Sequence, residues 1–265
     1  MRIHGTAIIA KKALIDESTF IGPYCVIGSQ VKIGKNVTLH SHVNIDGDTL
    51  IGDGCQIFPF SSIGTIPQDL KYRGENSRVI IGKNNIIREY STINTGTRLG
   101  SMETIIGDDC LLMTSAHVAH DCIVGNNVIM ANNATLGGHV NVENDVIIGG
   151  LSAVHQHIKI GCHAIIGGMS TVVNNVPPFA SISGERAQII GVNLIGMKRK
   201  NFAREVIQEI QELYESVFFN RSNELFACKI SAAKKRFSSL ASTYVFDFVE
   251  TVENRGFCQS AKNKL

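Results

Sequence analysis

Aliphatic residues recur at every sixth position over most of this chain. The series runs unbroken from Ile3 to Ile63. It resumes at Ile81, shifts by one residue at Ile106 and ends at Val172. A period of six fits neither the roughly 3.6 of a helix nor the 2 of a half-buried strand. The pattern therefore predicts a parallel β-helix, in which short strands meet at corners and each coil stacks on the next.

Three six-residue units make one triangular coil, so residues about 18 apart should lie one above another. The period fails twice, near 66–78 (IPQDLKYRGENSR) and near 97–104 (TRLGSMET). Interruptions of a solenoid usually project from it and often carry function. We therefore expect two inserted loops at the surface of the β-helix.

Beyond Val172 the pattern changes. Pro177 and Pro178 should end strand pairing, and the apolar spacing becomes helical from about residue 191. We predict helices at 202–220, 223–239 and 241–255, with Gly256 as a stop. The expected architecture is mainly β, with a β-helix domain at 1–183 and an α-helical domain at 191–265 that covers its end.

Composition narrows the possible classes of protein. The 265 residues are 44% hydrophobic and carry a net charge of +2, which favours a packed core and gives no field for binding nucleic acid. No apolar stretch is long enough to cross a membrane, and no leader precedes the repeat. We expect a cytoplasmic protein without stable membrane insertion. One position of the repeat holds small inward residues and includes Cys25, Cys55, Cys110 and Cys122, which we interpret as buried free thiols.

Histidines provide the candidate chemistry. They gather within about two coils, as His117, His120, His139, His155 and His157. The 18-residue stacking puts Asp121, His139 and His157 in one column, and His120, Gly138 and Gln156 in the next. A histidine can transfer protons near neutral pH, and a neighbouring carboxylate can fix its tautomer. From the spacing alone, a solvated polar ladder, a zinc site and a binding scaffold without catalysis remain open.

Several motifs together resemble one family. The segments are IGTIPQDLKYRGE, AHVAHDC, ANNATLGGHV, SAVHQ, VPPFA and GVNLIGMKRK, and they span nearly the whole chain. They resemble the bacterial UDP-N-acetylglucosamine O-acyltransferases of lipid A biosynthesis. The resemblance implies a left-handed β-helix with a C-terminal helical domain, assembled as a homotrimer. It also implies transfer of an (R)-3-hydroxyacyl chain from acyl carrier protein to the sugar 3-hydroxyl of UDP-N-acetylglucosamine, without metal or cofactor.

The same resemblance implies roles for particular residues. His120 would be the general base, Asp121 would orient it, and the N–H of Gly138 would stabilise the oxyanion. Substrate contacts are implied for Gln68, Asp69, Lys71, His117, His139, His155, Gln156, Asn193 and Arg199. Gly168 and Met169 lie where the family sets acyl-chain length, and a glycine there favours a long chain.

Two positions depart from the family pattern. Ile195 stands where some members carry an acid, and Asn94 stands where some carry histidine. Acyl-chain length and a 3-amino sugar acceptor remain open. A second alternative is the N-acyltransferase of the same pathway, whose extra domain would precede a repeat that here begins at Ile3. A third is a zinc enzyme like the carbonic anhydrases built on this type of helix.

Overall fold

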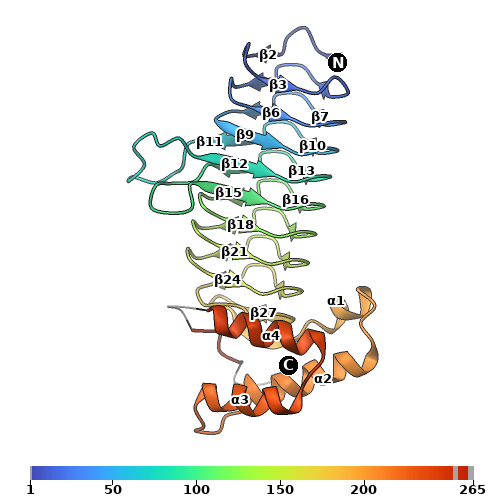
Figure 1. Cartoon of the computed structure of the whole chain (residues 1–265), viewed down its shortest axis with the longest axis vertical. Coiled ribbons are helices and arrows are strands. Elements are labelled where there is room, and N and C mark those ends of the chain that lie inside the picture. Colours follow the sequence, from blue (N-terminus) through green and yellow to red (C-terminus); the bar gives the residue numbers. More distant parts are fainter. Residues whose placement is uncertain (1, 253–255, 262–265) are drawn as a thin grey trace.

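The computed structural model describes residues 2–252 and 256–261. It is a long left-handed prism of short parallel strands with helices at one end (Figure 1). One face is the sheet β1 (Arg2–Ile3), β4 (Phe20–Ile21), β7 (Thr38–Leu39), β10 (Gln56–Ile57), β13 (Ile86–Ile87), β16 (Leu111–Leu112), β19 (Ile129–Met130), β22 (Ile147–Ile148), β25 (Ile165–Ile166), β27 (Ala180–Ser183) and β28 (Gln188–Val192). We call it the first sheet.

The other two faces follow the same chain order. The second sheet is β2 (Ile8–Ile9), β5 (Val26–Ile27), β8 (Asn44–Ile45), β11 (Ser62–Thr65), β14 (Thr92–Asn94), β17 (His117–Val118), β20 (Thr135–Leu136), β23 (Ala153–Val154) and β26 (Thr171–Val172). The third sheet is β3 (Leu14–Ile15), β6 (Lys32–Ile33), β9 (Asp48–Ile51), β12 (Arg78–Ile81), β15 (Glu103–Ile106), β18 (Ile123–Val124), β21 (Asn141–Val142) and β24 (Lys159–Ile160).

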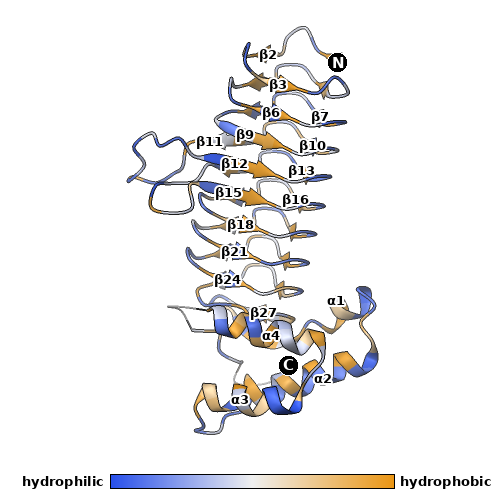
Figure 2. Cartoon of the chain, in the orientation of Figure 1, coloured by the Kyte–Doolittle hydropathy of each residue, from blue (hydrophilic) through white to orange (hydrophobic). Residues whose placement is uncertain are grey.

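The six-residue series lines the interior. In β10, Ile57 is fully buried while Gln56 points outward, and most of the other strands repeat this pattern. Coil pairing has the expected register, since Val118 lies beside Leu136 and Leu136 beside Val154. Figure 2 shows the apolar colour on the strands and the polar colour on the turns. The prediction of a β-helix is confirmed.

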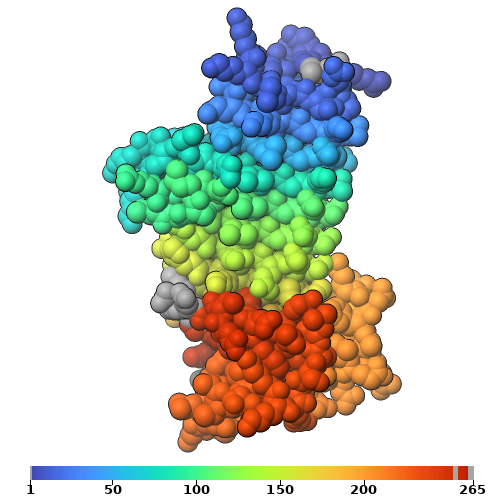
Figure 3. Space-filling model, viewed as in Figure 1, coloured from blue at the N-terminus to red at the C-terminus, as the bar shows by residue number. Residues whose placement is uncertain are grey.

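The two insertions explain the irregularities of the repeat. Ile51 pairs with Ile81, and Ile81 with Ile106, so these two coils are longer than 18 residues. The second insertion adds a number of residues that is not a multiple of six, which produces the one-residue shift at Ile106. The two loops project side by side from one edge of the prism and form its bulge in Figure 3. Arg78 and Glu103 join them through an ion pair.

Within the described residues, four helices lie against the far end of the prism (Figure 1). They are α1 (Leu194–Arg199), α2 (Arg204–Val217), α3 (Phe226–Arg236) and α4 (Leu240–Thr251). The last three confirm the predicted helices with shorter bounds; residues 253–255 of the third predicted helix lie outside the described residues. Helix α1 was not predicted. Buried Tyr214 ties α2 to the prism by donating its hydroxyl to the Pro178 carbonyl.

The inward cysteines are buried free thiols, as predicted. Cys122 Sγ donates to the Gly137 carbonyl at 3.1 Å, and Cys25, Cys55 and Cys110 make equivalent bonds. Burial raises the pKa of Cys122 to about 12. These thiols therefore act as small core residues. Among the described helices, none is both long enough and apolar enough to cross a bilayer.

Candidate active site

Three successive turns place the predicted histidine columns on one edge of the prism. These turns follow β17, β20 and β23, and each is bonded to the next through the backbone: the His139 N–H donates to the His120 carbonyl, and the His157 N–H to the Gly138 carbonyl, both at 3.0 Å. The rings of His139 and His157 stack with centroids 4.3 Å apart. The stacking inferred from the 18-residue repeat is therefore present.

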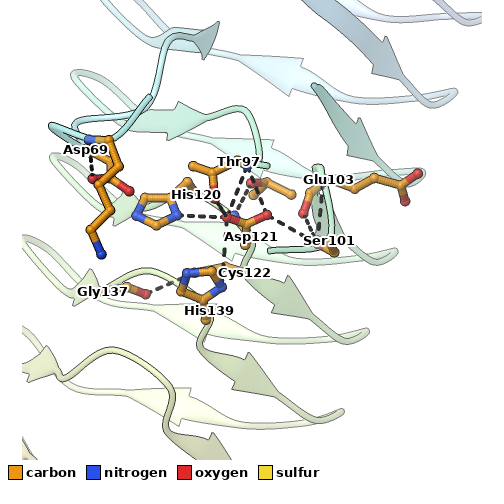
Figure 4. Close-up of polar contacts among 11 residues, drawn as sticks. Asp69, Thr97, Ser101, Glu103, His120, Asp121, Cys122, Gly137 and His139 are labelled. Carbon is orange, nitrogen blue, oxygen red and sulfur yellow. Dashed lines mark hydrogen bonds and ion pairs between the residues drawn. The ribbon is translucent and has the colours of Figure 1, made fainter. Parts of the chain in front are cut away.

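His120 and Asp121 form a hydrogen-bonded pair. His120 Nδ1 lies 2.8 Å from Asp121 Oδ2, as Figure 4 shows. Because an ionised carboxylate only accepts hydrogen bonds, Nδ1 carries the proton of this bond, and the neutral form of the ring has its lone pair on Nε2. The His120 side chain keeps 13% of its surface exposed, whereas Asp121 keeps 1%. The pair thus offers one accessible basic nitrogen supported by a buried carboxylate.

The Asp121 carboxylate is held ionised by its donors. Burial alone raises its pKa, but hydrogen bonds from His120 and Thr97 outweigh burial and lower the pKa from 3.8 to about 2. His139 Nδ1 lies 3.8 Å from Asp121 Oδ2. For His139, burial lowers the pKa, and the charges of Asp121 and Asp69 oppose that effect. Asp121 is therefore the fixed negative charge of the site.

Residues of the second insertion complete this network, and the sequence analysis did not identify them. Thr97 donates its hydroxyl to Asp121 Oδ2 at 2.6 Å and its N–H to Oδ1 at 3.0 Å. The Asp121 N–H donates to Thr104 Oγ1 at 2.9 Å. A Cβ on Gly100 would lie 2.2 Å from Asp121 Cγ. The only available signals were the break in the repeat and the glycine within it.

Gly138 lies directly beneath the His120 ring. A Cβ there would come within 2.5 Å of His120 Cε1, so a side chain would displace the imidazole. Among the described residues, no acceptor bonds the Gly138 N–H. This donor is therefore available beside the basic nitrogen.

The other predicted residues lie on neighbouring turns of this edge or on the first insertion. His117 Nδ1 lies 2.7 Å from Thr92 Oγ1, and burial lowers the His117 pKa. His155 and Gln156 are exposed two coils beyond His120. The first insertion supplies three more residues: Gln68, Asp69, which accepts from the Lys71 N–H at 2.9 Å, and Lys71. Asn94 anchors this insertion by donating to the Ile66 carbonyl at 3.0 Å.

Four predicted residues lie elsewhere on the same chain. Asn193 and Arg199 line a groove of about 690 Å³ beside the first sheet, together with Ile195. The Asn193 side chain is buried, caps α1 through the Gly196 N–H and donates to the His163 carbonyl at 2.8 Å. Gly168 and Met169 lie on the turn after β25, at the edge between the first and second sheets. One chain alone does not bring these groups to His120.

The site also contains a possible ligand set for a metal ion. His120, Asp121 and His139 each offer one ligand atom, and these atoms lie within 4.8 Å of one another. Two imidazoles and a carboxylate suit zinc. However, Asp121 already accepts hydrogen bonds from Thr97 and His120, and a metal ion would have to displace the proton on His120 Nδ1. The observed bonds fit proton transfer better than metal ligation.

Comparisons with known proteins agree with this geometry. Residues 12–47 and 103–138 match the model of bacterial transferase hexapeptide repeats, and residues 175–258 match that of UDP-N-acetylglucosamine O-acyltransferase domain 2. The chain is 47% identical over 258 residues to the acyl-(acyl-carrier-protein)–UDP-N-acetylglucosamine O-acyltransferase of Thermodesulfovibrio yellowstonii, covering 97% of this chain and 99% of the relative. The protein of that name from Rickettsia typhi is 53% identical over 260 residues, with 98% of both covered.

Similarity to a solved structure leads to the same family. The UDP-N-acetylglucosamine O-acyltransferase from Moraxella catarrhalis is 40% identical, with a TM-score of 0.93, 98% of this chain covered and 100% of that chain. Fold and site together define a hexapeptide-repeat acyltransferase. The chain belongs to the UDP-N-acetylglucosamine O-acyltransferase family.

The depressed pKa of Asp121 predicts a pH-dependent contribution to stability. The ionised carboxylate should stabilise the folded chain by about 2 kcal/mol above pH ~4, and this contribution should disappear as the pH falls from about 4 to about 2. The free energy of unfolding, measured for the wild type and Asp121→Asn at equal chain concentration, should therefore converge on acidification. A difference that stays constant down to pH ~2 would contradict the assignment.

Proposed function

We propose that this protein transfers an (R)-3-hydroxyacyl chain from acyl carrier protein to the 3-hydroxyl of UDP-N-acetylglucosamine, the first step of lipid A biosynthesis. The observation that carries the proposal is the His120–Asp121 pair, whose free Nε2 lies beside the unoccupied N–H of Gly138. Membership of the O-acyltransferase family supports the donor and the acceptor.

In the proposed mechanism, His120 Nε2 removes the proton of the sugar 3-hydroxyl as its oxygen attacks the thioester carbonyl. Asp121 stabilises the imidazolium through Nδ1–H. The Gly138 N–H donates to the oxyanion of the tetrahedral intermediate. Collapse of the intermediate expels the carrier thiolate, which takes the proton from His120 and becomes the free thiol. Atoms and charges balance without a cofactor, metal or covalent enzyme intermediate.

The remaining residues would hold the substrates. Gln68, Asp69 and Lys71 on the first insertion, with His117, His139, His155 and Gln156, would contact the acyl donor and the sugar. Asn193 and Arg199 would contact the nucleotide end. We place the protein in the cytoplasm, since its buried cysteines are free thiols, a state that a reducing compartment maintains. An amide product from a 3-amino sugar is the alternative outcome.

Replacement of the base should abolish transfer. With UDP-N-acetylglucosamine and 3-hydroxyacyl carrier proteins, we expect His120→Ala to lower kcat by at least about 10³-fold, because among the described histidines it is His120 that is hydrogen-bonded to the Asp121 carboxylate. Product formation is measured with radiolabelled donor. His157→Ala, on the outer side of the same stack, is the matched control.

Retention of wild-type kcat by His120→Ala would remove this residue as the base. A 3-amino sugar acceptor in the same assay separates ester formation from amide formation.

We propose that acyl-chain length depends on a strip of exposed backbone around Gly150 and Gly168, at the edge between the first and second sheets. We call it the Gly168 strip. A Cβ on Gly168 would lie 3.2 Å from the Gly150 carbonyl oxygen, so two glycines stack there, one coil apart. Gly168 is exposed, and neighbouring Met169 is 74% exposed. The bare strip leaves space for a long chain.

A side chain at Gly168 should shorten the preferred donor. We expect Gly168→Met to lower kcat/KM for the longest accepted 3-hydroxyacyl donor by about 10-fold or more, with little change for donors several carbons shorter. Met169→Ala is the control that enlarges the strip instead. An unchanged donor profile in Gly168→Met would contradict the proposed role.

We propose a homotrimer in which neighbouring copies complete each site. The His120 edge, the Gly168 strip and the Asn193–Arg199 groove lie on different parts of one chain. A stack of surface rings adds support, since Tyr24, Phe60 and Tyr90 are each about half exposed and His42 lies between the first two. Such exposed aromatic stacks are typical of interfaces.

Mixed oligomers should test the shared site. The native mass should be three times the 28.8 kDa of the chain, as measured by light scattering. Co-expression of His120→Ala with Arg199→Glu should restore activity. With random assembly, roughly a quarter of the sites between neighbouring chains combine an intact His120 from one chain with an intact Arg199 from the other. Activity no higher than that of either variant alone would mean that each chain carries its complete site.

A further inference from the structure

The second insertion makes several hydrogen bonds to the site. It leaves the prism after β14 and returns in β15, one coil before the turn that carries His120. Between these strands, Thr97 is buried and faces Asp121 with both its hydroxyl and its N–H. This contact joins the insertion to the carboxylate that orients the candidate base.

We propose that Thr97 is a positioning residue for proton transfer: it fixes the Asp121 carboxylate against His120 Nδ1–H and so keeps His120 Nε2 directed at the acceptor hydroxyl. This inference rests on the proposed function and adds a residue to it. Thr97 does not contact the reacting atoms and acts only through Asp121.

Both oxygens of the Asp121 carboxylate accept hydrogen bonds from the second insertion. Asp121 Oδ2 is shared by the Thr97 hydroxyl at 2.6 Å and His120 Nδ1 at 2.8 Å. The Thr97 N–H lies 3.0 Å from Oδ1 and 3.1 Å from Oδ2, and Oδ1 is 3.4 Å from Ser101 Oγ. With donors on both oxygens, the carboxylate plane is fixed from the side opposite His120 (Figure 4).

The backbone of the second insertion also packs against Asp121. Gly100 packs so closely against the carboxylate that a Cβ would overlap it, and the Gly100 N–H donates to the Thr97 carbonyl at 3.0 Å, closing the turn. Thr104, where the loop rejoins the prism, accepts the Asp121 N–H. Asp121 has a φ of 59°, a left-handed conformation that this bond helps to hold. Both the backbone and the side chain of Asp121 are therefore held by the insertion.

Loss of the Thr97 hydroxyl would leave the Asp121 carboxylate free to turn. Asp121 is 1% exposed, so water cannot replace a lost donor on Oδ2. His139 Nδ1, at 3.8 Å, is the next polar group and would compete for the same oxygen. Rotation of the carboxylate towards His139 would weaken its bond to His120.

The experiment compares three variants of the full-length oligomer. Thr97→Val removes the hydroxyl at constant shape, and Thr97→Ser keeps it. Thr95→Val is the matched control, since Thr95 is also buried in the same segment but, within the part of the chain that the structure describes, makes no hydrogen bond to Asp121. We expect Thr97→Val to lower kcat about 10-fold with KM for both substrates within about twofold of wild type, and Thr97→Ser to recover most of the loss.

A second measurement separates positioning from a general structural effect. In an Asp121→Asn background, Thr97→Val should lower kcat by less than about twofold, because the group through which it acts is already altered. A full additional 10-fold loss in that background would overturn the proposal, and so would an equal loss in Thr97→Ser and Thr97→Val. Unfolding midpoints of all variants show whether each remains folded.

His120→Ala, assayed beside them, distinguishes failure of the proposed role of Thr97 from failure of the proposed base. If His120→Ala is inactive while Thr97→Val has wild-type kcat, the positioning role fails and the proposed base stands. If His120→Ala keeps its activity, His120 is not the base; if the wild type transfers no acyl chain, the proposed function itself fails.

Discussion

Backbone pairing between successive coils is the constraint on which this structure depends. A strand of two residues contributes few hydrogen bonds, so no coil is stable alone and each is held by the coils on either side. The interior has room for one aliphatic side chain per strand and a small residue at each corner, as Leu136 and Cys122 illustrate. Because pairing fixes the register, a residue on a turn lies over its counterpart 18 positions later wherever the coil carries no insertion. The site is assembled by this stacking.

Stacking supplies the positions of groups but not their orientation. His120, Gly138 and Gln156 share a column whatever their side chains do, and a solvated ladder would have the same spacing. Orientation comes from the places where the repeat is broken. Thr97 and Gly100 belong to a segment outside the periodic pattern, and they contact Asp121 from the side that the regular coils leave open. Regular and irregular segments thus have different tasks in one site.

The same division explains what the sequence could predict. The β-helix, the buried cysteines and the two histidine columns follow from a period, so arithmetic locates them. The contact of Thr97 with Asp121 depends on the path of a nonperiodic loop, which no spacing rule describes. Helix α1 was missed because it has six residues, too few for a helical apolar pattern, and begins at Leu194 directly after its cap Asn193. The distribution of Gly168, Arg199 and His120 over different parts of the surface required the three-dimensional structure.

The 18-residue coil also makes the prism modular. Coils before the first insertion pair only with their neighbours and lie far along the axis from Asp121, so the length of that half could change by whole coils without altering the pair. Between Thr97 and His157 no such freedom exists, because the loop, the carboxylate, the imidazole and the glycine occupy consecutive coils in a fixed order. The N-terminal half of the prism can therefore gain or lose whole coils without disturbing the site. The half that begins at the second insertion cannot.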